Sequence, residues 1–163
     1  MLPVPRLCEV RFDVRPWDGS PGAARELVPL VDGVSLVELV AGFERAAGFD
    51  VPGAYAGLVL EHSRFGELTG YLAGAPESSY RAGQGGIALL GCDCGEVGCW
   101  PLQARVVVDS AHVTWLGFAQ PFRPRRDYSG FGPFVFRREQ YERAAREAAG
   151  HGPDTGPPAL ARA

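Results

Sequence analysis

The chain has 163 residues and a formal net charge of −3 at pH 7, with 46% hydrophobic and 21% charged residues. These proportions exclude a globally disordered chain, because they supply enough apolar side chains for a core. The acidic balance gives no overall attraction to nucleic acid or to anionic membranes, and no apolar run approaches the roughly 20 residues of a membrane-spanning helix. The first residues also lack the basic start and apolar block of a secretory signal, so we expect a cytoplasmic protein.

The first third of the chain predicts a strand and a helix. Residues 7–14 alternate between apolar and polar side chains, which is typical of a half-buried antiparallel strand. A shorter strand is expected at residues 28–31. Ser35 precedes a run of apolar residues at helical spacing, and Glu38 follows it by three residues, as in a capping box. A helix is therefore predicted over residues 35–47, and Gly48 favours a stop directly after it.

The middle of the chain has a weaker pattern that becomes regular again after a glycine-rich stretch. Short strands are expected at residues 55–60 and 68–72, where β-branched and aromatic residues occur. Three apolar runs then follow at residues 87–90, 103–108 and 113–118. Asp109-Ser110 is a tight-turn candidate between the last two runs, and the cysteine segment is the loop that joins the first two, so the runs predict an antiparallel meander.

The last third predicts one more strand, a helix and a tail. Residues 134–136 have strand character, and residues 138–149 have an apolar face with favourable Glu–Arg pairs on the opposite side. The proline- and glycine-rich residues 150–163 predict a disordered tail. We therefore expect one α+β domain over residues 1–149, in which an antiparallel β-sheet is packed by two helices.

Three of the four cysteines fall close together, at Cys92, Cys94 and Cys99. Thiolates are favoured ligands of zinc, and a short loop with glycines lets several sulfurs converge on one ion. Gly95 permits the backbone turn that would direct amides at a sulfur. The pattern predicts a structural zinc site whose fourth position is open to His112, His62, Cys8 or water.

Two other interpretations of the same cysteines stay open. A pair of thiols can cycle between dithiol and disulfide on an exposed turn, although the carboxylates of Asp93 and Glu96 disfavour thiolates by like-charge repulsion. Alternatively, the cysteines are small apolar residues in a tight turn that Trp100 anchors to the core. The sequence does not choose between zinc, redox chemistry and packing.

A second candidate site lies within residues 114–138, where arginines alternate with aromatic residues. Arg123, Arg125 and Arg126 are the candidate anion-binding residues, because guanidinium groups beside aromatic rings bind phosphates and bases. However, all 16 basic residues of the chain are arginine, so a general bias toward arginine accounts for part of this pattern. A solvated loop over the edge of the core is the alternative.

Several segments carry a resemblance to known sequences. The longest is residues 90–102, LGCDCGEVGCWPL, and the others are residues 113–115, 120–121 and 127–134. Together they resemble a group of uncharacterised bacterial proteins that is frequent in actinobacteria, and the cysteine segment, GCxCGExGCWPL, is its most distinctive part. No activity is established for this group, so the resemblance implies one intact domain and assigns no catalytic residue.

The favoured interpretation is a small cytoplasmic binding or accessory protein whose cysteine loop holds structural zinc. The alternatives are a thiol-dependent redox enzyme that uses the same cysteines, and an anion- or nucleic-acid-binding module that uses residues 114–138. Whether the chain is an enzyme stays open. We do not expect a membrane or nucleic acid as partner, whereas a protein partner or a second copy of the chain is compatible with the sequence.

Overall fold

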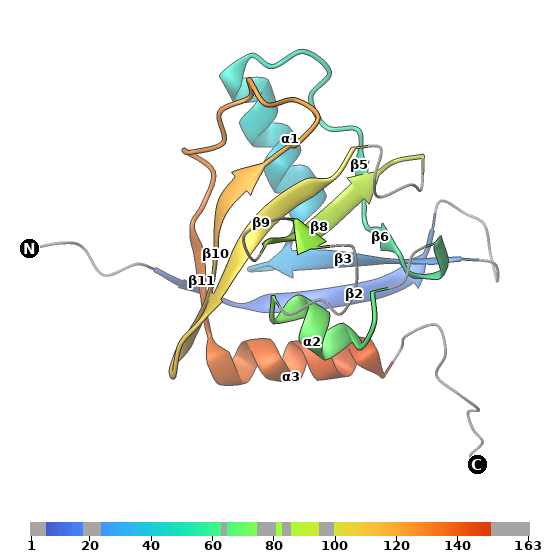
Figure 1. Ribbon diagram of the computed structural model, residues 1–163, viewed down its shortest axis with the longest axis vertical. Helices are drawn as coiled ribbons and strands as arrows, with labels where there is room; N and C mark the ends of the chain where they lie inside the picture. The colour runs from blue at the N-terminus through green and yellow to red at the C-terminus, as the bar shows by residue number, and fades with distance from the viewer. Residues whose placement is uncertain are drawn as a thin grey trace, which may run out of the picture.

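The computed structural model describes residues 6–17, 24–62, 65–74, 81–82, 86–94 and 100–150. These residues form two β-sheets and three α-helices (Figure 1). The mixed α and β content agrees with the prediction. The single antiparallel sheet packed by two helices does not, because the strands divide between two sheets and a third helix is present. The predicted disordered tail lies outside the described residues from residue 151 onward.

The larger sheet has the strand order β1-β11-β10-β9-β8-β5, with β7 beside β8. Its strands are β1 (Leu7–Cys8), β5 (Tyr55–Ala56), β7 (Arg81–Ala82), β8 (Gly86–Cys92), β9 (Leu102–Val108), β10 (His112–Ala119) and β11 (Phe134–Arg137). Strands β8, β9 and β10 form the predicted antiparallel meander. The sheet is mixed because β1 pairs with β11 in parallel.

The smaller sheet is antiparallel and consists of β2 (Val10–Pro16), β3 (Arg25–Val31), β4 (Val34–Ser35) and β6 (Leu58–Val59). The strand predicted over residues 7–14 is therefore interrupted at Glu9, where the chain leaves the larger sheet and enters the smaller one. Gln140 holds this crossing. Its side-chain oxygen accepts from the backbone N–H of Val10 at 2.9 Å, and its amide donates to the Val10 carbonyl at 2.6 Å.

The helices are α1 (Leu36–Ala47), α2 (Leu68–Leu72) and α3 (Arg138–Ala149). Helix α1 begins as predicted, with the Ser35 hydroxyl accepting from the Val37 N–H at 3.1 Å, and ends at Gly48 with φ of 78°. The strand predicted at residues 68–72 is wrong. That segment is helix α2, since helical spacing lets both Tyr71 and Leu72 turn into the core.

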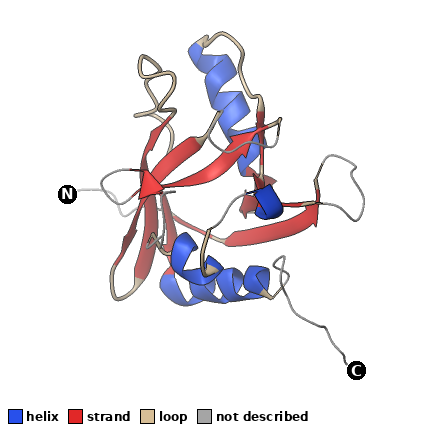
Figure 2. Cartoon of the chain, turned by 45° about the vertical axis from the view of Figure 1, so that its right-hand side comes forward, coloured by secondary structure: helices blue, strands red, loops and turns tan. Residues whose placement is uncertain are grey.

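The hydrophobic core lies between the two sheets and α3. Figure 2 shows α1 and α3 at opposite ends of the molecule with the sheets between them. The Tyr141 ring on α3 packs edge-on against Phe12 with a centroid distance of 5.4 Å. Its hydroxyl accepts from Trp115 Nε1 at 3.0 Å and donates to the Leu72 carbonyl at 2.6 Å, so the polar ends of these buried rings are satisfied. No helix in the described part of the chain is long and apolar enough to cross a membrane.

Gly57 is expected to tolerate no side chain, because it lies between β5 and β6 directly against β3. A Cβ at this position would meet the Leu27 carbonyl oxygen at 2.5 Å and Val28 Cγ2 at 2.7 Å. The Gly57 N–H donates to Glu26 Oε1 at 2.8 Å, so the backbone cannot move away without losing this bond. We expect Gly57→Ala to lower the free energy of unfolding by about 1–3 kcal/mol in urea denaturation.

The matched control is Gly42→Ala on α1. A Cβ at Gly42 meets only the end of the Arg45 side chain, at 4.0 Å. Since alanine is the better helix former, this control should raise the free energy of unfolding by up to about 1 kcal/mol. Equal effects of the two substitutions would show that the contact at Gly57 is not tight.

Candidate functional site

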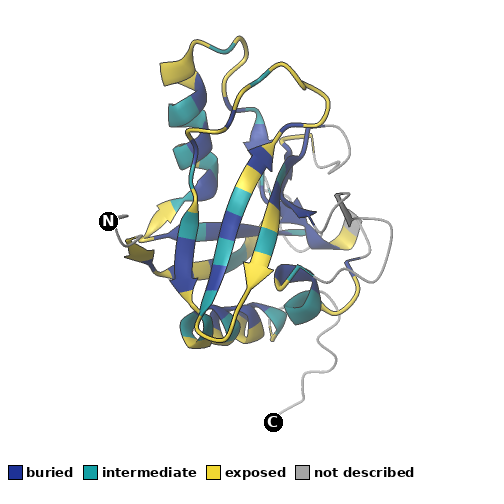
Figure 3. Cartoon of the chain, turned by 60° about the vertical axis from the view of Figure 1, so that its left-hand side comes forward, coloured by how far each residue is buried: buried dark blue, intermediate teal, exposed yellow. Residues whose placement is uncertain are grey.

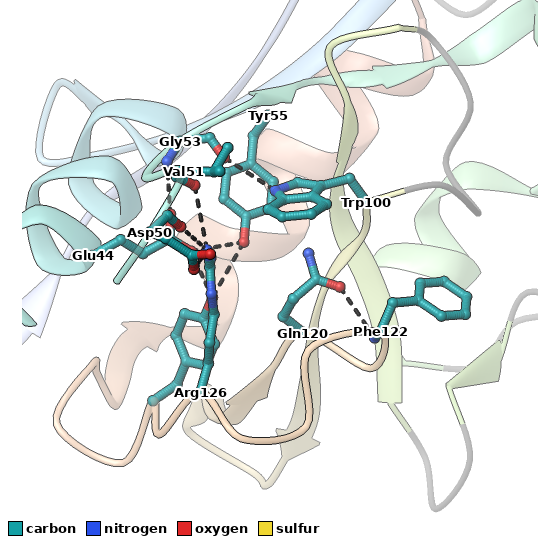
Figure 4. Close-up of polar contacts among 10 residues, drawn as sticks. Glu44, Asp50, Val51, Gly53, Tyr55, Trp100, Gln120, Phe122 and Arg126 are labelled. Carbon is teal, nitrogen blue, oxygen red and sulfur yellow. Dashed lines mark hydrogen bonds and ion pairs between the residues drawn. The ribbon is translucent and has the colours of Figure 1, made fainter. Parts of the chain in front are cut away.

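The cysteine segment and the arginine segment, which are separate in the sequence, meet at Trp100. Cζ of Arg123 lies 4.5 Å from the centroid of the Trp100 ring, and Cζ of Arg126 lies 5.2 Å from it. The Trp100 ring also packs against Tyr55 with a centroid distance of 6.3 Å. The end of the cysteine segment and the arginine segment therefore belong to one site, of which Figure 4 shows Trp100, Tyr55 and Arg126.

A buried carboxylate that sequence reasoning missed lies at the centre of this site. Glu44 follows Val40 by four residues and Leu36 by eight on α1, so it faces the core, and none of its surface is exposed. The sequence carries one signal for it, a charged residue on the apolar stripe of a predicted helix. Charged residues are almost never fully buried unless they are paired, so this signal indicates a partner elsewhere in the chain.

Four donors converge on the Glu44 carboxylate. Its Oε1 accepts from the Gly53 N–H at 2.7 Å. Its Oε2 accepts from the hydroxyls of Tyr55 at 2.8 Å and Tyr128 at 2.5 Å, and from Nη1 of Arg126 at 3.1 Å. We call these five residues the Glu44 cluster. Because its charge is satisfied by hydrogen bonds from every side, Glu44 acts as a clamp between loops and is not a free base.

The tyrosines of the Glu44 cluster are held in their neutral form. Burial raises the pKa of Tyr55, and its hydrogen bond with Tyr128 and the nearby Glu44 charge raise it further. Burial also raises the pKa of Tyr128, and its hydrogen bond to Glu44 adds to the effect. Both hydroxyls therefore remain hydrogen-bond donors at neutral pH.

The prediction of three anion-binding arginines is wrong for Arg126, which pairs with a carboxylate of the protein itself. Only 6% of its side chain is exposed, and its guanidinium forms an ion pair with buried Glu44. Its Nη2 donates to the carbonyls of Asp50 and Val51. Burial lowers the pKa of Arg126, but the interactions with Tyr128 and Glu44 outweigh burial and leave that pKa raised. Arg126 is therefore charged, and its guanidinium binds groups of the protein itself.

Arg123 and Arg125 remain on the surface. Arg123 donates through Nη1 to the Phe122 carbonyl at 2.9 Å and lies over the Trp100 ring. Arg125 is exposed and makes no hydrogen bond or ion pair with the described residues. Phe122 beside them is 54% exposed. These three side chains form the accessible part of the site.

The loop after α1 has an unusual backbone that the Glu44 cluster holds in place. Val51 has φ of 50° and Ala54 has φ of 71°, in the left-handed region that side chains other than glycine rarely adopt. Such a residue costs on the order of 1–3 kcal/mol unless its surroundings fix it. Arg126 binds the Val51 carbonyl, and Trp100 Nε1 donates to the Gly53 carbonyl at 3.0 Å. The loop conformation therefore depends on side chains from two other segments.

Gln120 places an unpaired donor next to Trp100. Only 1% of Gln120 is exposed, and its Oε1 accepts from the Phe122 N–H at 3.2 Å. Its Nε2 is buried and has no acceptor in the described part of the chain. Figure 4 shows the amide directed toward Trp100 and Tyr55. A buried donor without an acceptor costs about 1–3 kcal/mol, so an acceptor delivered to this position gains a hydrogen bond.

Cys92 and Cys94 lie at the end of β8, beside the Glu44 cluster. Cys92 pairs with Tyr55 across the sheet and is 8% exposed, whereas Cys94 is exposed. The Cys94 N–H donates to Cys92 Sγ at 3.4 Å, and the Cys92 thiol lies 3.6 Å from Asp93 Oδ1. The backbone at residues 92–94 thus directs an amide at a sulfur, whereas the turn predicted at Gly95 lies outside the described residues. Cys99 lies outside the described residues.

The fold places His112 far from the cysteines, so the prediction of His112 as a fourth metal ligand is wrong. His112 begins β10 beside the Val108 end of β9, whereas Cys92 lies past the Leu102 end. The seven residues of β9 separate the two positions by about 20 Å at 3.3 Å per residue. The His112 Nδ1 instead lies 3.7 Å from Asp109 Oδ1.

Cys8 is also far from Cys92, because β1 and β8 are four strands apart in the larger sheet, or about 19 Å. The side chain of His62 lies outside the described residues. Within the described ranges, no group of three or more His, Cys, Asp or Glu residues is arranged to hold a metal ion. The three-cysteine site stays a prediction, since one of its members is not described.

Comparison with known proteins finds no matching family model, no matching curated protein and no matching solved structure. The functional interpretation therefore depends on the side chains around Trp100. Two features distinguish this end of the molecule. The first is the neighbouring thiols of Cys92 and Cys94, with the Cys94 amide directed at the Cys92 sulfur. The second is the surface formed by Phe122, Arg123 and Arg125.

Proposed function

We propose that this chain is a small cytoplasmic binding or accessory protein whose cysteine loop holds a structural zinc ion. The observation that carries the proposal is the Cys94 N–H that donates to Cys92 Sγ at 3.4 Å. This hydrogen bond favours the Cys92 thiolate, the form that binds zinc, whereas the Asp93 carboxylate 3.6 Å from the same sulfur favours the thiol until a metal ion displaces its proton. Cys92 and Cys94 supply two ligands, and the spacing of the sequence makes Cys99 the third.

The surroundings favour a structural role for the metal. Trp100, directly after the cysteine segment, is anchored by its hydrogen bond to the Gly53 carbonyl at 3.0 Å. A zinc ion would tie the cysteine loop to this anchor and to the end of β8. Closed zinc sites contribute folding free energy, whereas catalytic sites keep an open position for substrate. The Glu44 carboxylate next to the loop is fully occupied by donors and offers no general base.

The test is elemental analysis with thiol titration on protein purified without chelator. We expect about one zinc per chain, with the cysteine-loop thiols masked in the native protein. Cys92→Ser and Cys94→Ser should each lose the metal. The matched controls Cys8→Ala and His112→Gln should retain it, because both residues lie about 20 Å from Cys92.

Other outcomes would replace the zinc interpretation. Metal-free protein that loses a pair of thiols on mild oxidation would support a redox enzyme that uses the same cysteines. Metal-free protein with unreactive thiols would leave a packing role only. Loss of zinc from the His112→Gln variant would contradict the register of β9 and β10.

A second candidate function is anion binding by the loop at residues 122–125. The observation that favours it is the Arg123 guanidinium stacked on Trp100 beside exposed Arg125 and Phe122. Stacked arginines and exposed aromatic rings bind single strands and phosphates through charge and ring contacts. With Arg126 paired to Glu44, this surface has two available arginines instead of the three that the sequence predicts.

A further inference from the structure

The side-chain amide of Gln120 is buried with half of its hydrogen-bonding capacity unused. Its Nε2 is the one buried side-chain nitrogen or oxygen that lacks a partner among the residues that the structure describes. The orientation of the amide is fixed, because Oε1 accepts from the Phe122 N–H at 3.2 Å and a flipped amide would set two donors against each other. Since buried polar groups are almost always paired, this donor indicates an acceptor that comes from outside the chain.

The polar atoms next to Nε2 are already engaged. Figure 4 shows the Gln120 amide directed toward Trp100 and Tyr55. Trp100 Nε1 donates to the Gly53 carbonyl at 3.0 Å, and the Tyr55 hydroxyl donates to Glu44 at 2.8 Å. The loop that Trp100 holds is also the one with the strained backbone. Unsatisfied donors and strained backbone that persist in a folded protein are typical of functional sites.

Two arginines of the neighbouring loop carry positive charge that no carboxylate neutralises. Cζ of Arg123 lies 4.5 Å from the centroid of the same Trp100 ring. Neither Arg123 nor Arg125 forms an ion pair with a residue that the structure describes. Figure 3 shows the loop after β10 largely exposed beside α1, with α3 at the opposite end of the molecule. The unpaired donor and the unpaired charges therefore lie at one end of the protein, around Trp100.

The acidic residues of these loops have other partners. The Asp127 carboxylate accepts from the Ser129 N–H at 2.9 Å. The Asp50 carboxylate lies 3.6 Å from Arg126, and Glu44 is enclosed by its four donors. The charge left available to a ligand at this loop is therefore positive, and it attracts anions.

We propose that Gln120, Arg123 and Trp100 form a binding site for a small carboxylic acid with an aromatic body. One carboxylate oxygen accepts from Gln120 Nε2 and the other pairs with the Arg123 guanidinium, as charge-assisted hydrogen bonds favour. The aromatic body lies against Trp100 and the exposed ring of Phe122. The proposal rests on the second candidate function, anion binding by the loop at residues 122–125, whose ligand it names, and it does not depend on zinc.

The burial of Nε2 limits the size and charge of the ligand. The flat surface of a protein partner or the backbone of a nucleic acid cannot reach this atom, whereas a small molecule enters when the exposed side chains of Arg123 and Phe122 change rotamer. A carboxylate carries one negative charge and costs less to desolvate than a phosphate, which carries about −1.5 to −2 at pH 7. An amine offers no acceptor to Nε2 once it is protonated.

The experiment follows the side-chain NH2 signals of glutamine by NMR in ¹⁵N-labelled protein while benzoate is added. The chain has four glutamines and no asparagine, so few such signals occur, and Gln120→Met identifies the Gln120 pair by its absence. We expect benzoate to move this pair downfield with a dissociation constant on the order of 1 mM. Benzamide, which is neutral, and inorganic phosphate should bind at least about tenfold more weakly.

Two substitutions test the two ligand contacts separately. Gln120→Glu keeps an oxygen for the Phe122 N–H but removes the donor, so benzoate should no longer move the backbone amides of residues 122–125. Arg123→Gln should weaken benzoate binding by about tenfold, because it removes one charge-assisted hydrogen bond. The matched control is Arg146→Gln, which removes the same charge from an exposed position on α3 and should leave binding unchanged.

The inference is overturned if the Gln120 pair stays in place at tens of millimolar benzoate, as it would with an ordered water as the acceptor of Nε2. Benzamide that binds as tightly as benzoate, or an Arg146→Gln variant as weak as Arg123→Gln, would also overturn it. If phosphate moves the backbone amides of residues 122–125 while the Gln120 pair stays fixed, the site at Gln120 is wrong and the anion-binding candidate stands. If no probe moves either set of signals, both are wrong, and zinc content of the same preparations reports separately on the cysteine loop.

Discussion

Glu44→Gln is expected to lower the free energy of unfolding by about 3–5 kcal/mol, because it removes one partner of a buried ion pair. Glu44 has no exposed surface and Arg126 has 6%, so the guanidinium left behind cannot be solvated in place. The NH2 group of the glutamine would also face one of the N–H or O–H groups that now donate to the carboxylate, so two donors would be opposed. The loss is a large part of the roughly 5–15 kcal/mol that stabilises an ordinary domain. Urea denaturation measures it directly.

Two further variants separate the clamp from a general effect on α1. Glu38→Gln makes the same change on the exposed side of the helix and should stay within about 0.5 kcal/mol of the parent protein. Glu44→Leu combined with Arg126→Met removes both charges and should recover part of the loss, since no charge is left unpaired. A Glu44→Gln variant as stable as Glu38→Gln would show that the carboxylate does not hold these loops together.

The elements that local patterns define were predictable. Helix α1 has a capping serine and a terminal glycine, and both act as the sequence indicates. Helix α3 has an alanine-rich inner face that includes Tyr141 and Ala145, and it occupies the predicted residues 138–149. The meander of β8, β9 and β10 followed from three apolar runs, with a tight turn predicted between the last two and the cysteine segment as the loop between the first two. For each helix the signal lies within about a dozen residues of the chain.

The pairing between distant segments was not predictable from such patterns. Residues 7–14 keep their alternation through Glu9, although β1 and β2 belong to different sheets, because alternation reports burial and not the identity of the neighbouring strand. His112 is close to Cys92 in sequence order but at the other end of β9 in space. A hairpin places two strands side by side, but residues at opposite ends of the shared strand β9 stay far apart.

The Glu44 cluster shows the same limit for the site. Arg126 looks like its neighbour Arg125 in the sequence, yet one is buried in an ion pair and the other is exposed. The difference arises from Glu44, which lies 82 residues earlier in the chain. A charged residue on an apolar helical stripe was visible in the sequence, but its partner was not, because any of 16 arginines was a candidate.

Alkaline pH should unfold this protein steeply, because burial raises the pKa of Tyr55, Tyr128 and Tyr141 above the ordinary value of 10.0. Below about pH 10 these phenols are neutral in both the folded and the unfolded chain, and their contribution to stability is fully present. Above it, the unfolded chain releases protons that the folded chain retains, so stability falls as pH rises. Between its unfolded and its folded pKa, each such tyrosine contributes up to about 1.4 kcal/mol per pH unit.

Urea denaturation at a series of pH values from neutral to strongly alkaline measures this slope, and ultraviolet absorbance of phenolate follows the ionisation itself. Because the three hydroxyls are buried, phenolate should appear together with unfolding and not before it. Tyr128→Phe should make the slope shallower, although it also lowers stability at neutral pH by removing a donor from Glu44. If the three tyrosines ionise near pH 10 while the protein stays folded, water reaches the Glu44 cluster and Tyr141, and the burial on which the clamp depends is not present in solution.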